Sequence, residues 1–426
     1  MKWRHKLAKL IVEKSGPLTG KVRINGAKNS VLKLMAASIL AEEPCYIESV
    51  PDLLDVEVMN QLLESLGLTV EYDKLDESLV IYPAKVLKCE APYEIIQKMR
   101  ASFLVMGPLL AKKGVAKVSM PGGCAIGARP IDLHLKGFQA LGAEVTLGHG
   151  YIEAKAENGL VGNEIYLDFP SVGATENIMM AATMAEGQTL LQNAAKEPEI
   201  IDLANFLNEM GANVKGAGTD TIRINGVKSL KGTRHQTIPD RIITATYMVA
   251  AALTKGDVTI ENVVSSHVKP ITAKLREMGV IVEDDDDRIR VIGTRDLKAV
   301  DITTLPYPGF PTDVQAQFMA LLSVAEGTSV INETVFENRF GHVAEINRMG
   351  ANVKIEGHSA VIQGVKGLQG AQVKATDLRA GAALVLAGLI SEGLTEIDDI
   401  YHIDRGYPQI EKDLVSLGAL IRRVEV

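Results

Sequence analysis

A short phrase built around glycine returns six times along the 426-residue chain, at an almost constant interval. Each copy is an apolar residue, a glycine, and then a small or apolar residue. The six glycines are Gly67, Gly142, Gly211, Gly279, Gly350 and Gly418. Successive glycines are 75, 69, 68, 71 and 68 residues apart. A fixed period of this kind indicates a fold built from copies of one supersecondary unit.

A second mark, a charged residue followed by glycine or proline, precedes each of these glycines by 23 to 28 residues. That interval leaves room for one strand and one helix. Alternating stretches that end in glycine, at 221–226, 288–293 and 359–364, are typical of half-buried strands. We therefore predict six repeats of a βαβαββ-type unit.

The six repeats divide most simply into two lobes of three. The first helix of each repeat, such as 245–253, is apolar all round, as buried helices are. We therefore predict an α/β protein, a two-lobed inside-out α/β barrel. The first lobe is expected to hold residues 28–238, and the second residues 1–27 with 239–426. The strand-like stretch 21–26 is expected to complete the last repeat, which lacks its final strand.

Composition excludes several functional classes. A net charge of −8 and only 4% aromatic residues argue against a nucleic-acid surface. No apolar stretch is long enough to span a membrane, and three cysteines without a CxxC pair favour a reducing compartment and no structural zinc. The acidic run 283–287 lacks the calcium-loop pattern and is interpreted as a solvated hairpin tip. We expect a cytoplasmic protein without a metal site.

Polar residues stand at the predicted start of every buried helix. They are Lys28 with Asn29, Arg100, Ser171 with Thr175, Asp240 with Arg241, Asp313, and Asp377 with Arg379. A helix start presents free N–H groups and a partial positive charge. The repeat should bring three such starts together in each lobe, and if the lobes face each other there, they form a site for anions.

The aspartates at these starts admit a second interpretation, because Asp240, Asp313 and Asp377 could be ordinary N-caps. The accompanying lysine and arginines favour the anion site. A cation opposes the positive end of the helix dipole, and its presence there indicates a negative ligand.

The most distinctive stretch of the chain is the loop 121–130, which contains three glycines, Cys124 and Arg129. Glycines allow a backbone to move and to approach a ligand closely. A nearby arginine favours the thiolate, the reactive form of cysteine. We therefore predict a functional role for Cys124 and structural roles for Cys45 and Cys89.

Taken together, these segments resemble the UDP-N-acetylglucosamine 1-carboxyvinyltransferase family of enolpyruvyl transferases. The matching stretches are 26–29, 99–102, 121–130, 171–175, 197–199, 239–241, 310–317, 333–339, 375–380 and 400–407. They extend from about residue 11 to the C-terminus. The resemblance implies the same two-lobed fold of six repeats.

The resemblance also implies a reaction in which phosphoenolpyruvate gives its enolpyruvyl group to the 3′-hydroxyl of UDP-N-acetylglucosamine. Phosphate leaves by addition and elimination, in the first committed step of peptidoglycan synthesis. The two small molecules are the expected partners, and no cofactor is expected. Two alternatives remain: the sister enzyme that acts on shikimate 3-phosphate, which lacks the cysteine loop, and a catalytically idle paralogue that binds the UDP-sugar.

The family resemblance assigns roles to individual residues. Cys124 is the expected general acid and can form a covalent adduct with phosphoenolpyruvate. Asp313 is the expected base or proton relay for the sugar hydroxyl, and Lys28 and Arg405 complete the catalytic set. Phosphoenolpyruvate is expected to bind Lys28, Asn29, Arg129 and Arg405. The UDP-sugar is expected to bind Asn29, Arg100, Ser171, Val172, Gly173, Asp240, Asp313 and Val335. The residues expected to line the cleft are Asp55, Glu197, Phe336, Arg339, Asp377 and Arg379.

Two departures from the family pattern lie near these residues. Phe169 and Pro170 stand where many members have a lysine-containing pair, and Lys33 replaces a proline in the first buried helix. Neither departure touches the proposed chemistry. The resemblance also implies that fosfomycin, an epoxide that mimics phosphoenolpyruvate, alkylates Cys124.

Overall fold

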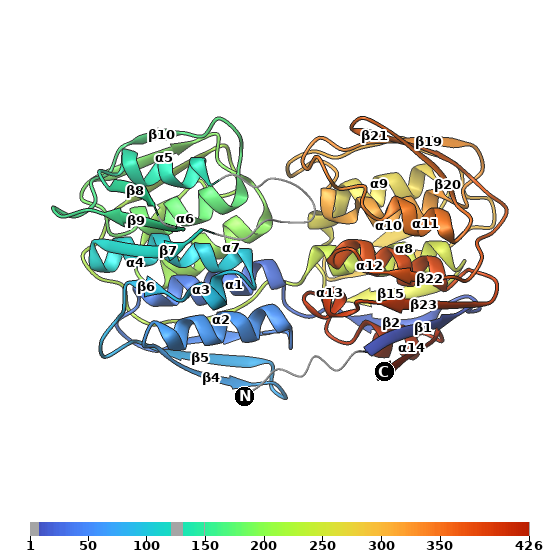
Figure 1. Cartoon of the computed structure of the whole chain (residues 1–426), viewed down its shortest axis with the longest axis horizontal. Helices are drawn as coiled ribbons and strands as arrows, with labels where there is room; N and C mark the ends of the chain where they lie inside the picture. The colour runs from blue at the N-terminus through green and yellow to red at the C-terminus, as the bar shows by residue number, and fades with distance from the viewer. Residues whose placement is uncertain (1–7, 121–130, 149, 426) are drawn as a thin grey trace. The chain divides into compact units, whose positions relative to one another are not determined.

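The sequence repeat corresponds to six copies of one structural motif in the computed structural model (Figure 1). The structure describes residues 8–120, 131–148 and 150–425. These residues divide into two compact units, each with its own hydrophobic core. Unit 1 holds residues 8–25 and 239–425, and unit 2 holds residues 26–120 and 131–238 apart from residue 149.

The described part of unit 2 contains three four-stranded sheets. In each, the first two strands run parallel and the remaining neighbours run antiparallel. Their orders are β14 (Arg234–Gln236), β3 (Cys45–Glu48), β5 (Ser78–Tyr82), β4 (Thr69–Asp73); β6 (Glu90–Ala91), β7 (Val115–Ser119), β9 (Tyr151–Lys155), β8 (Glu144–Gly148); and β10 (Glu164–Tyr166), β11 (Gln188–Gln192), β13 (Thr221–Asn225), β12 (Asn213–Lys215).

Within its described residues, unit 1 repeats the same arrangement three times. The orders are β22 (Gln372–Lys374), β23 (Leu394–Asp398), β1 (Ala8–Glu13), β24 (Leu420–Glu425); β2 (Thr19–Arg23), β15 (Asp257–Glu261), β17 (Arg288–Ile292), β16 (Ile281–Asp284); and β18 (Ile302–Thr303), β19 (Thr328–Asn332), β21 (Ser359–Gln363), β20 (Asn352–Glu356). The predicted strands at 221–226, 288–293 and 359–364 are therefore confirmed as β13, β17 and β21.

The prediction that the stretch 21–26 completes the last repeat was wrong. The strand that completes it is β1, which lies antiparallel between β23 and β24, as the blue strand among the red ones in Figure 1 shows. The stretch 21–26 instead forms most of β2, the parallel edge strand beside β15. Alternation indicates a strand at 21–26 but carries no information about its partner, which tertiary pairing decides.

Six apolar helices lie inside the two units, as predicted. They are α1 (Lys28–Ala37), α4 (Met106–Lys113, preceded by the 3₁₀ helix η2, Arg100–Val105) and α6 (Val172–Ala182) in unit 2, and α8 (Arg241–Leu253), α10 (Gln315–Leu322, preceded by the 3₁₀ helix η4, Thr312–Val314) and α12 (Leu378–Gly388) in unit 1. In α8 every residue after the first is buried. An apolar surface all round the helix is stable only when other elements cover every side.

A second set of helices is amphipathic and covers the sheets. It comprises α2 (Leu54–Ser65), α5 (Asp132–Ala140), α7 (Pro198–Glu209), α9 (Lys269–Glu277), α11 (Val343–Arg348) and α14 (Ile410–Ser416). Each of the six repeated glycines follows one of these helices and has a φ angle between 90° and 105°. Only glycine adopts such angles without strain, so the repeated phrase is a helix C-terminal cap.

The remaining short helices are α3 (Tyr93–Ile96), α13 (Tyr401–Asp404), η1 (Ser38–Leu40) and η3 (Ser265–Val268). Among the described helices, none combines the length and the apolar character needed to cross a membrane.

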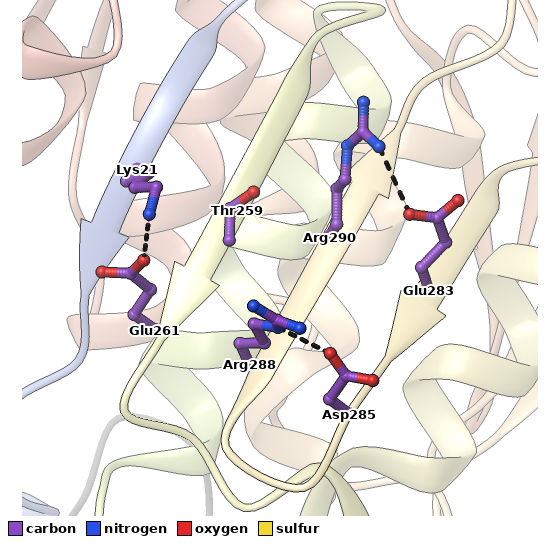
Figure 2. Close-up of a pocket in the computed structure, with 7 residues that line it drawn as sticks. All are labelled: Lys21, Thr259, Glu261, Glu283, Asp285, Arg288 and Arg290. Carbon is purple, nitrogen blue, oxygen red and sulfur yellow. Dashed lines mark hydrogen bonds and ion pairs between the residues drawn. The ribbon is translucent and has the colours of Figure 1, made fainter.

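The outer face of the sheet formed by β2, β15, β17 and β16 carries charges in matched pairs (Figure 2). Lys21 pairs with Glu261, Arg288 with Asp285, and Arg290 with Glu283. The tip of this hairpin, residues 285–287, is exposed, which confirms the prediction for the acidic run. Since every cation in this shallow pocket has an acidic partner, we assign no ligand to it.

Candidate active site

The polar residues singled out in the sequence do stand at the starts of the buried helices. In unit 2, Lys28 is the first residue of α1, Arg100 is the first of η2, and Ser171 is the N-cap of α6. In unit 1, Asp240 and Asp377 are the N-caps of α8 and α12, and Asp313 lies in η4 directly before α10. The predicted placement is therefore confirmed for all six helices.

Lys28 forms a buried ion pair in unit 2. Its Nζ lies 3.1 Å from Oδ2 of Asp55, a residue in the first turn of α2, and the two side chains are 12% and 4% exposed. Removing charges from water is costly unless they are paired, so Asp55 holds the ammonium group in place at the start of α1. Asn29 follows on the same helix and is half-buried, and Glu197 is buried at the start of α7.

His134 lies beside the starts of η2 and α6, and sequence reasoning did not single it out. Burial lowers its pKa to about 3, with a contribution from the nearby Arg100, so the imidazole is neutral. A Cβ atom on Gly173 would lie 3.4 Å from Nε2 of His134. The glycine therefore leaves room for this ring at the α6 start. A lone histidine in an amphipathic helix gave no sequence signal for this position.

Asn177 determines which nitrogen of His134 carries the proton. Its Oδ1 accepts from the backbone N–H of Gly107 at 2.7 Å, which fixes the orientation of the amide. The Nδ2 group then donates to the carbonyl of Phe103 at 3.2 Å and to Nδ1 of His134 at 3.1 Å. Since Nδ1 accepts a hydrogen bond, Nε2 is protonated and can donate.

Asp313 is the centre of the charged cluster in unit 1. Oδ1 of Asp313 accepts from Nη2 of Arg339 at 2.7 Å, and Oδ2 accepts from Nη2 of Arg379 at 3.2 Å. Both arginine side chains are 4% exposed, whereas Asp313 is 27% exposed. Burial lowers the pKa of Arg379, but the Asp313 carboxylate and other neighbours outweigh it and raise the pKa above its ordinary value. The cluster thus presents a carboxylate that a ligand can reach.

The two other aspartates of this unit serve as helix caps. Asp240 accepts from the N–H groups of Ile242 and Ile243 at 2.8 and 3.0 Å. Asp377 accepts in the same way from those of Arg379 and Ala380. The N-cap interpretation therefore holds for these two residues. Asp313 differs, because its carboxylate accepts hydrogen bonds from the side chains of Arg339 and Arg379.

Glu333 shapes the loop that carries Val335, Phe336 and Arg339. Its buried carboxylate accepts from the backbone N–H groups of Val335 at 2.9 Å and Phe336 at 3.2 Å. The hydroxyls of two threonines, Thr304 and Thr312, donate to the same carboxylate. The Phe336 ring lies 5.9 Å from the guanidinium of Arg339. Glu333 therefore sets the position of the loop beside Asp313, a role that the sequence alone did not reveal.

Cys124 and Arg129 lie outside the described residues, so their predicted roles stay predictions. Arg405 follows α13 directly and is half-buried. In both units, then, cations and free N–H groups gather at the starts of buried helices, which is an arrangement suited to a small ligand with several negative charges.

The chain is similar to several known proteins. A family model described as EPSP synthase (3-phosphoshikimate 1-carboxyvinyltransferase) matches residues 12–414. UDP-N-acetylglucosamine 1-carboxyvinyltransferase 1 from Caldanaerobacter subterraneus is 64% identical over 415 residues, which is 97% of this chain and 99% of that protein. The chain belongs to the UDP-N-acetylglucosamine 1-carboxyvinyltransferase family. The family resemblance seen in the sequence is thus confirmed.

Other relatives agree with this assignment. UDP-N-acetylglucosamine 1-carboxyvinyltransferase from Finegoldia magna is 60% identical over 97% of this chain and 98% of its own length. Among solved structures, the enolpyruvyl transferase NikO from Streptomyces tendae has a TM-score of 0.90 at 26% identity, covering 99% of this chain and 100% of NikO. EPSP synthase from Acinetobacter baumannii matches with a TM-score of 0.77 at 20% identity, which shows the shared fold alone.

This member of the UDP-N-acetylglucosamine 1-carboxyvinyltransferase family departs from the expected pattern at Lys33 and Phe169. The structure shows the surroundings of both residues. Nζ of Lys33, inside α1, lies 3.4 Å from Oε1 of Glu176 in α6, and both side chains are buried. Lys33 therefore lies beside the buried carboxyl group of Glu176. Phe169, two residues before the α6 cap, is 45% exposed, so an aromatic ring stands in the pair in which a lysine was expected.

Proposed function

We propose that this protein transfers the enolpyruvyl group of phosphoenolpyruvate to the 3′-hydroxyl of UDP-N-acetylglucosamine and releases phosphate. This reaction would be the first committed step of peptidoglycan synthesis. The observation that carries the proposal is the Asp313 carboxylate held by Arg339 and Arg379 at a helix start, in a chain 64% identical to a transferase of that name. Such a carboxylate can accept a proton while the cations around it attract an anionic substrate.

The proposed chemistry has two stages. In the addition, a proton is delivered to C3 of phosphoenolpyruvate, positive charge develops at C2, and the sugar hydroxyl attacks C2 as it loses its own proton. The resulting tetrahedral ketal then loses phosphate and a proton from C3, which regenerates the vinyl group. One group must therefore donate and another must accept a proton near a highly charged ligand. We assign the donor to Cys124 and the acceptor to Asp313.

The exposure of the charged groups fits Asp313 as the acceptor. At 27% exposed, its carboxylate is more accessible than the two arginines that hold it. The arginines fix its position from the buried side, which reduces the freedom that must be lost on reaching the reactive geometry. Val335 and Asp240 lie on the same unit and are proposed to contact the UDP-sugar.

The family resemblance also supplies the proposed contacts to the anionic substrates. Lys28, Asn29, Arg129 and Arg405 would bind the phosphate and carboxylate of phosphoenolpyruvate. The start of α6, with Ser171, Val172 and Gly173, would offer backbone N–H groups to the diphosphate of the UDP-sugar, and Arg100 would add charge there. Asp55, Glu197, Phe336, Asp377 and the two arginines on Asp313 would orient these groups. Cys45 and Cys89 are both free thiols, in keeping with a proposed cytoplasmic location.

The proposal is tested by identifying the product. Purified protein is incubated with phosphoenolpyruvate and UDP-N-acetylglucosamine, and the nucleotide sugar is examined by mass spectrometry while phosphate is measured in the same sample. A gain of one enolpyruvyl group per phosphate released supports the transfer. If the UDP-sugar binds by calorimetry but neither product forms, the protein is an idle sugar-binding paralogue, and the proposal is wrong.

A further inference from the structure

Behind Asp313 lies a buried polar network that the proposed reaction does not use. It centres on Tyr407, which is 1% exposed and stands two residues after Arg405. The phenol oxygen of Tyr407 lies 2.9 Å from Oγ1 of Thr246 in α8 and 3.3 Å from Nε2 of Gln317 in α10. These two helices and the turn after α13 come from distant parts of unit 1, so the network joins three elements.

The direction of the hydrogen bonds follows from counting protons. Thr246 donates its single hydroxyl proton to the carbonyl of Ile242 at 2.9 Å. In its contact with Thr246, Tyr407 is therefore the donor. Nε2 of Gln317 lies 3.3 Å from the phenol oxygen and 3.2 Å from Oγ1 of Thr246, so it can donate to either oxygen. Nε2 of Gln317 also donates to the backbone carbonyl of Asp313 at 3.1 Å. The amide thus links the phenol to the main chain of the proposed base.

Tyr407 also contacts the side-chain partner of that base. The guanidinium of Arg379 lies over the Tyr407 ring at 5.6 Å from its centroid, a distance at which a cation and an aromatic face attract. The turn that carries Tyr407 approaches α12 closely. A Cβ atom on Gly406 would lie 2.6 Å from the side chain of Leu378, the residue before Arg379. Because Gly406 has no side chain, the turn can approach α12 closely, and the Tyr407 ring lies against the guanidinium of Arg379.

We propose that Tyr407 is a positioning residue that holds the Asp313–Arg379 ion pair, through its ring on Arg379 and through Gln317 on the backbone of Asp313. This inference rests on the proposed function, because it concerns the proposed base. Arg339 and Arg379 face the Asp313 carboxylate, and both Asp240, from the α8 start, and Tyr407 act on Arg379.

The test compares two tyrosines of the same unit. Tyr407→Phe removes the hydroxyl that binds Thr246 and Gln317 but keeps the ring. Tyr247→Phe is the matched control: Tyr247 is 2% exposed, stands next to Thr246, and donates to Asp413 at 2.6 Å, away from Asp313. Each variant loses one buried hydroxyl, so comparable losses of thermal stability are expected.

Activity should separate the two variants. Tyr407→Phe is expected to lower kcat about tenfold with little change in KM, since the loss of one hydrogen bond is worth roughly that factor. The acidic limb of its pH–rate profile should move to higher pH, because a loosened Arg379 stabilises the carboxylate less. Tyr247→Phe should leave kcat and the profile unchanged. Equal kcat and equal profiles for Tyr407→Phe and the wild type would overturn the proposal.

Two further measurements keep the test decisive. Thr246→Val removes the partner of the phenol. If the network acts as a unit, the double variant with Tyr407→Phe should lose no more kcat than the worse of the two single variants. Fully additive losses of kcat would count against the network. Crystal structures of the wild type and Tyr407→Phe read the Arg379–Asp313 contact directly, even if the wild type proves inactive. An unchanged contact of 3.2 Å would refute the positioning role, whereas wild-type inactivity alone would refute the proposed function.

Discussion

Nη2 of Arg379 donates to Oδ2 of Asp313 over 3.2 Å, although the two residues are 66 positions apart in the sequence. Nη2 of Arg339 donates to the other carboxylate oxygen of Asp313, Oδ1. Both arginine side chains are 4% exposed, and the Asp313 carboxylate between them offsets much of the cost of burying their charges. The pair links the stability of the unit to its proposed chemistry, since both depend on the same negative charge.

Replacing Asp313 by asparagine should therefore affect both properties. Asp313→Asn keeps the size of the side chain but removes the proton acceptor, and kcat is expected to fall by about two to four orders of magnitude. The variant should also unfold at a lower temperature, because two buried cations lose their partner. Phosphate release and thermal unfolding measure the two effects.

The control for Asp313→Asn is Asp257→Asn. Asp257 also pairs with an arginine, Arg290, but the pair is more than 40% exposed on the outer face of a sheet. Activity should be unchanged, and stability should change by no more than about 1 kcal/mol. A loss of activity in the control as large as in Asp313→Asn would mean that the effect is not specific to the proposed base.

Fosfomycin should inactivate the protein by alkylating Cys124. The thiolate would attack an epoxide carbon, forming a C–S bond as the C–O bond opens. Cys124→Asp keeps an acid but removes the nucleophile, so it should retain activity and resist the compound. Cys89→Ser should remain sensitive. Mass spectrometry detects the adduct, and a wild-type protein that turns over but is never alkylated would remove Cys124 from its assigned role.

His134 should remain neutral throughout the physiological range. Because its pKa is lowered to about 3, the imidazole signals in an NMR titration should not move between pH 5 and pH 8. The unfolded state takes up the proton near pH 6.5, so this group lowers stability as pH falls from about 6.5 towards 3. His134→Gln should flatten that part of the stability curve. A titration of the ring near pH 6.5 would contradict the assigned environment.

Glu176 should produce the opposite slope at higher pH. Burial raises its pKa to about 8 and Glu199 and Glu197 add to the shift, although Lys33 opposes it. The folded state therefore keeps a proton that the unfolded state releases near pH 4.5, and this contribution to stability is lost as pH rises towards 8. The stability of the wild type relative to Glu176→Gln should fall by up to about 1.4 kcal/mol per pH unit in this window. Urea unfolding at pH 5, 6.5 and 8 measures it, and a constant difference would count against the raised pKa.

Replacing Gly211, one of the six repeated glycines, should destabilise the fold through backbone strain alone. Gly211 has a φ angle of 105°, and a Cβ atom there would meet no atom within 4 Å. Gly211→Ala should therefore cost about 1 kcal/mol through backbone strain, and Gly211→Asn less, because asparagine tolerates this region better. Gly367 also has open space but no positive φ angle, so Gly367→Ala should cost nothing in a chemical unfolding experiment.

The sequence was informative where a local rule decides the structure. A helix end with a φ angle of 90° to 105° strongly favours glycine, and this preference made the six caps visible as a repeat. Likewise, an unbroken apolar stretch such as 245–253 can only be a buried helix, and Asp240 and Asp377 at such helix starts have the chemistry of caps.

Partners that are distant in the chain could not be predicted in the same way. Nothing in the alternation of residues 8–13 shows that β1 lies between β23 and β24. The pairing of Asp313 with Arg379, and the contacts of Tyr407 with Thr246 and Gln317, depend on how the helices of unit 1 pack. Resemblance to a family supplied the candidate residues, but their hydrogen-bond partners came from the structure.

The most direct test of the account is phosphate release from phosphoenolpyruvate with three acceptor conditions side by side: UDP-N-acetylglucosamine, shikimate 3-phosphate and no acceptor. We expect phosphate release to depend on UDP-N-acetylglucosamine and to stay at the no-acceptor level with shikimate 3-phosphate. Release that depends on shikimate 3-phosphate instead, or no release with either acceptor, would contradict it.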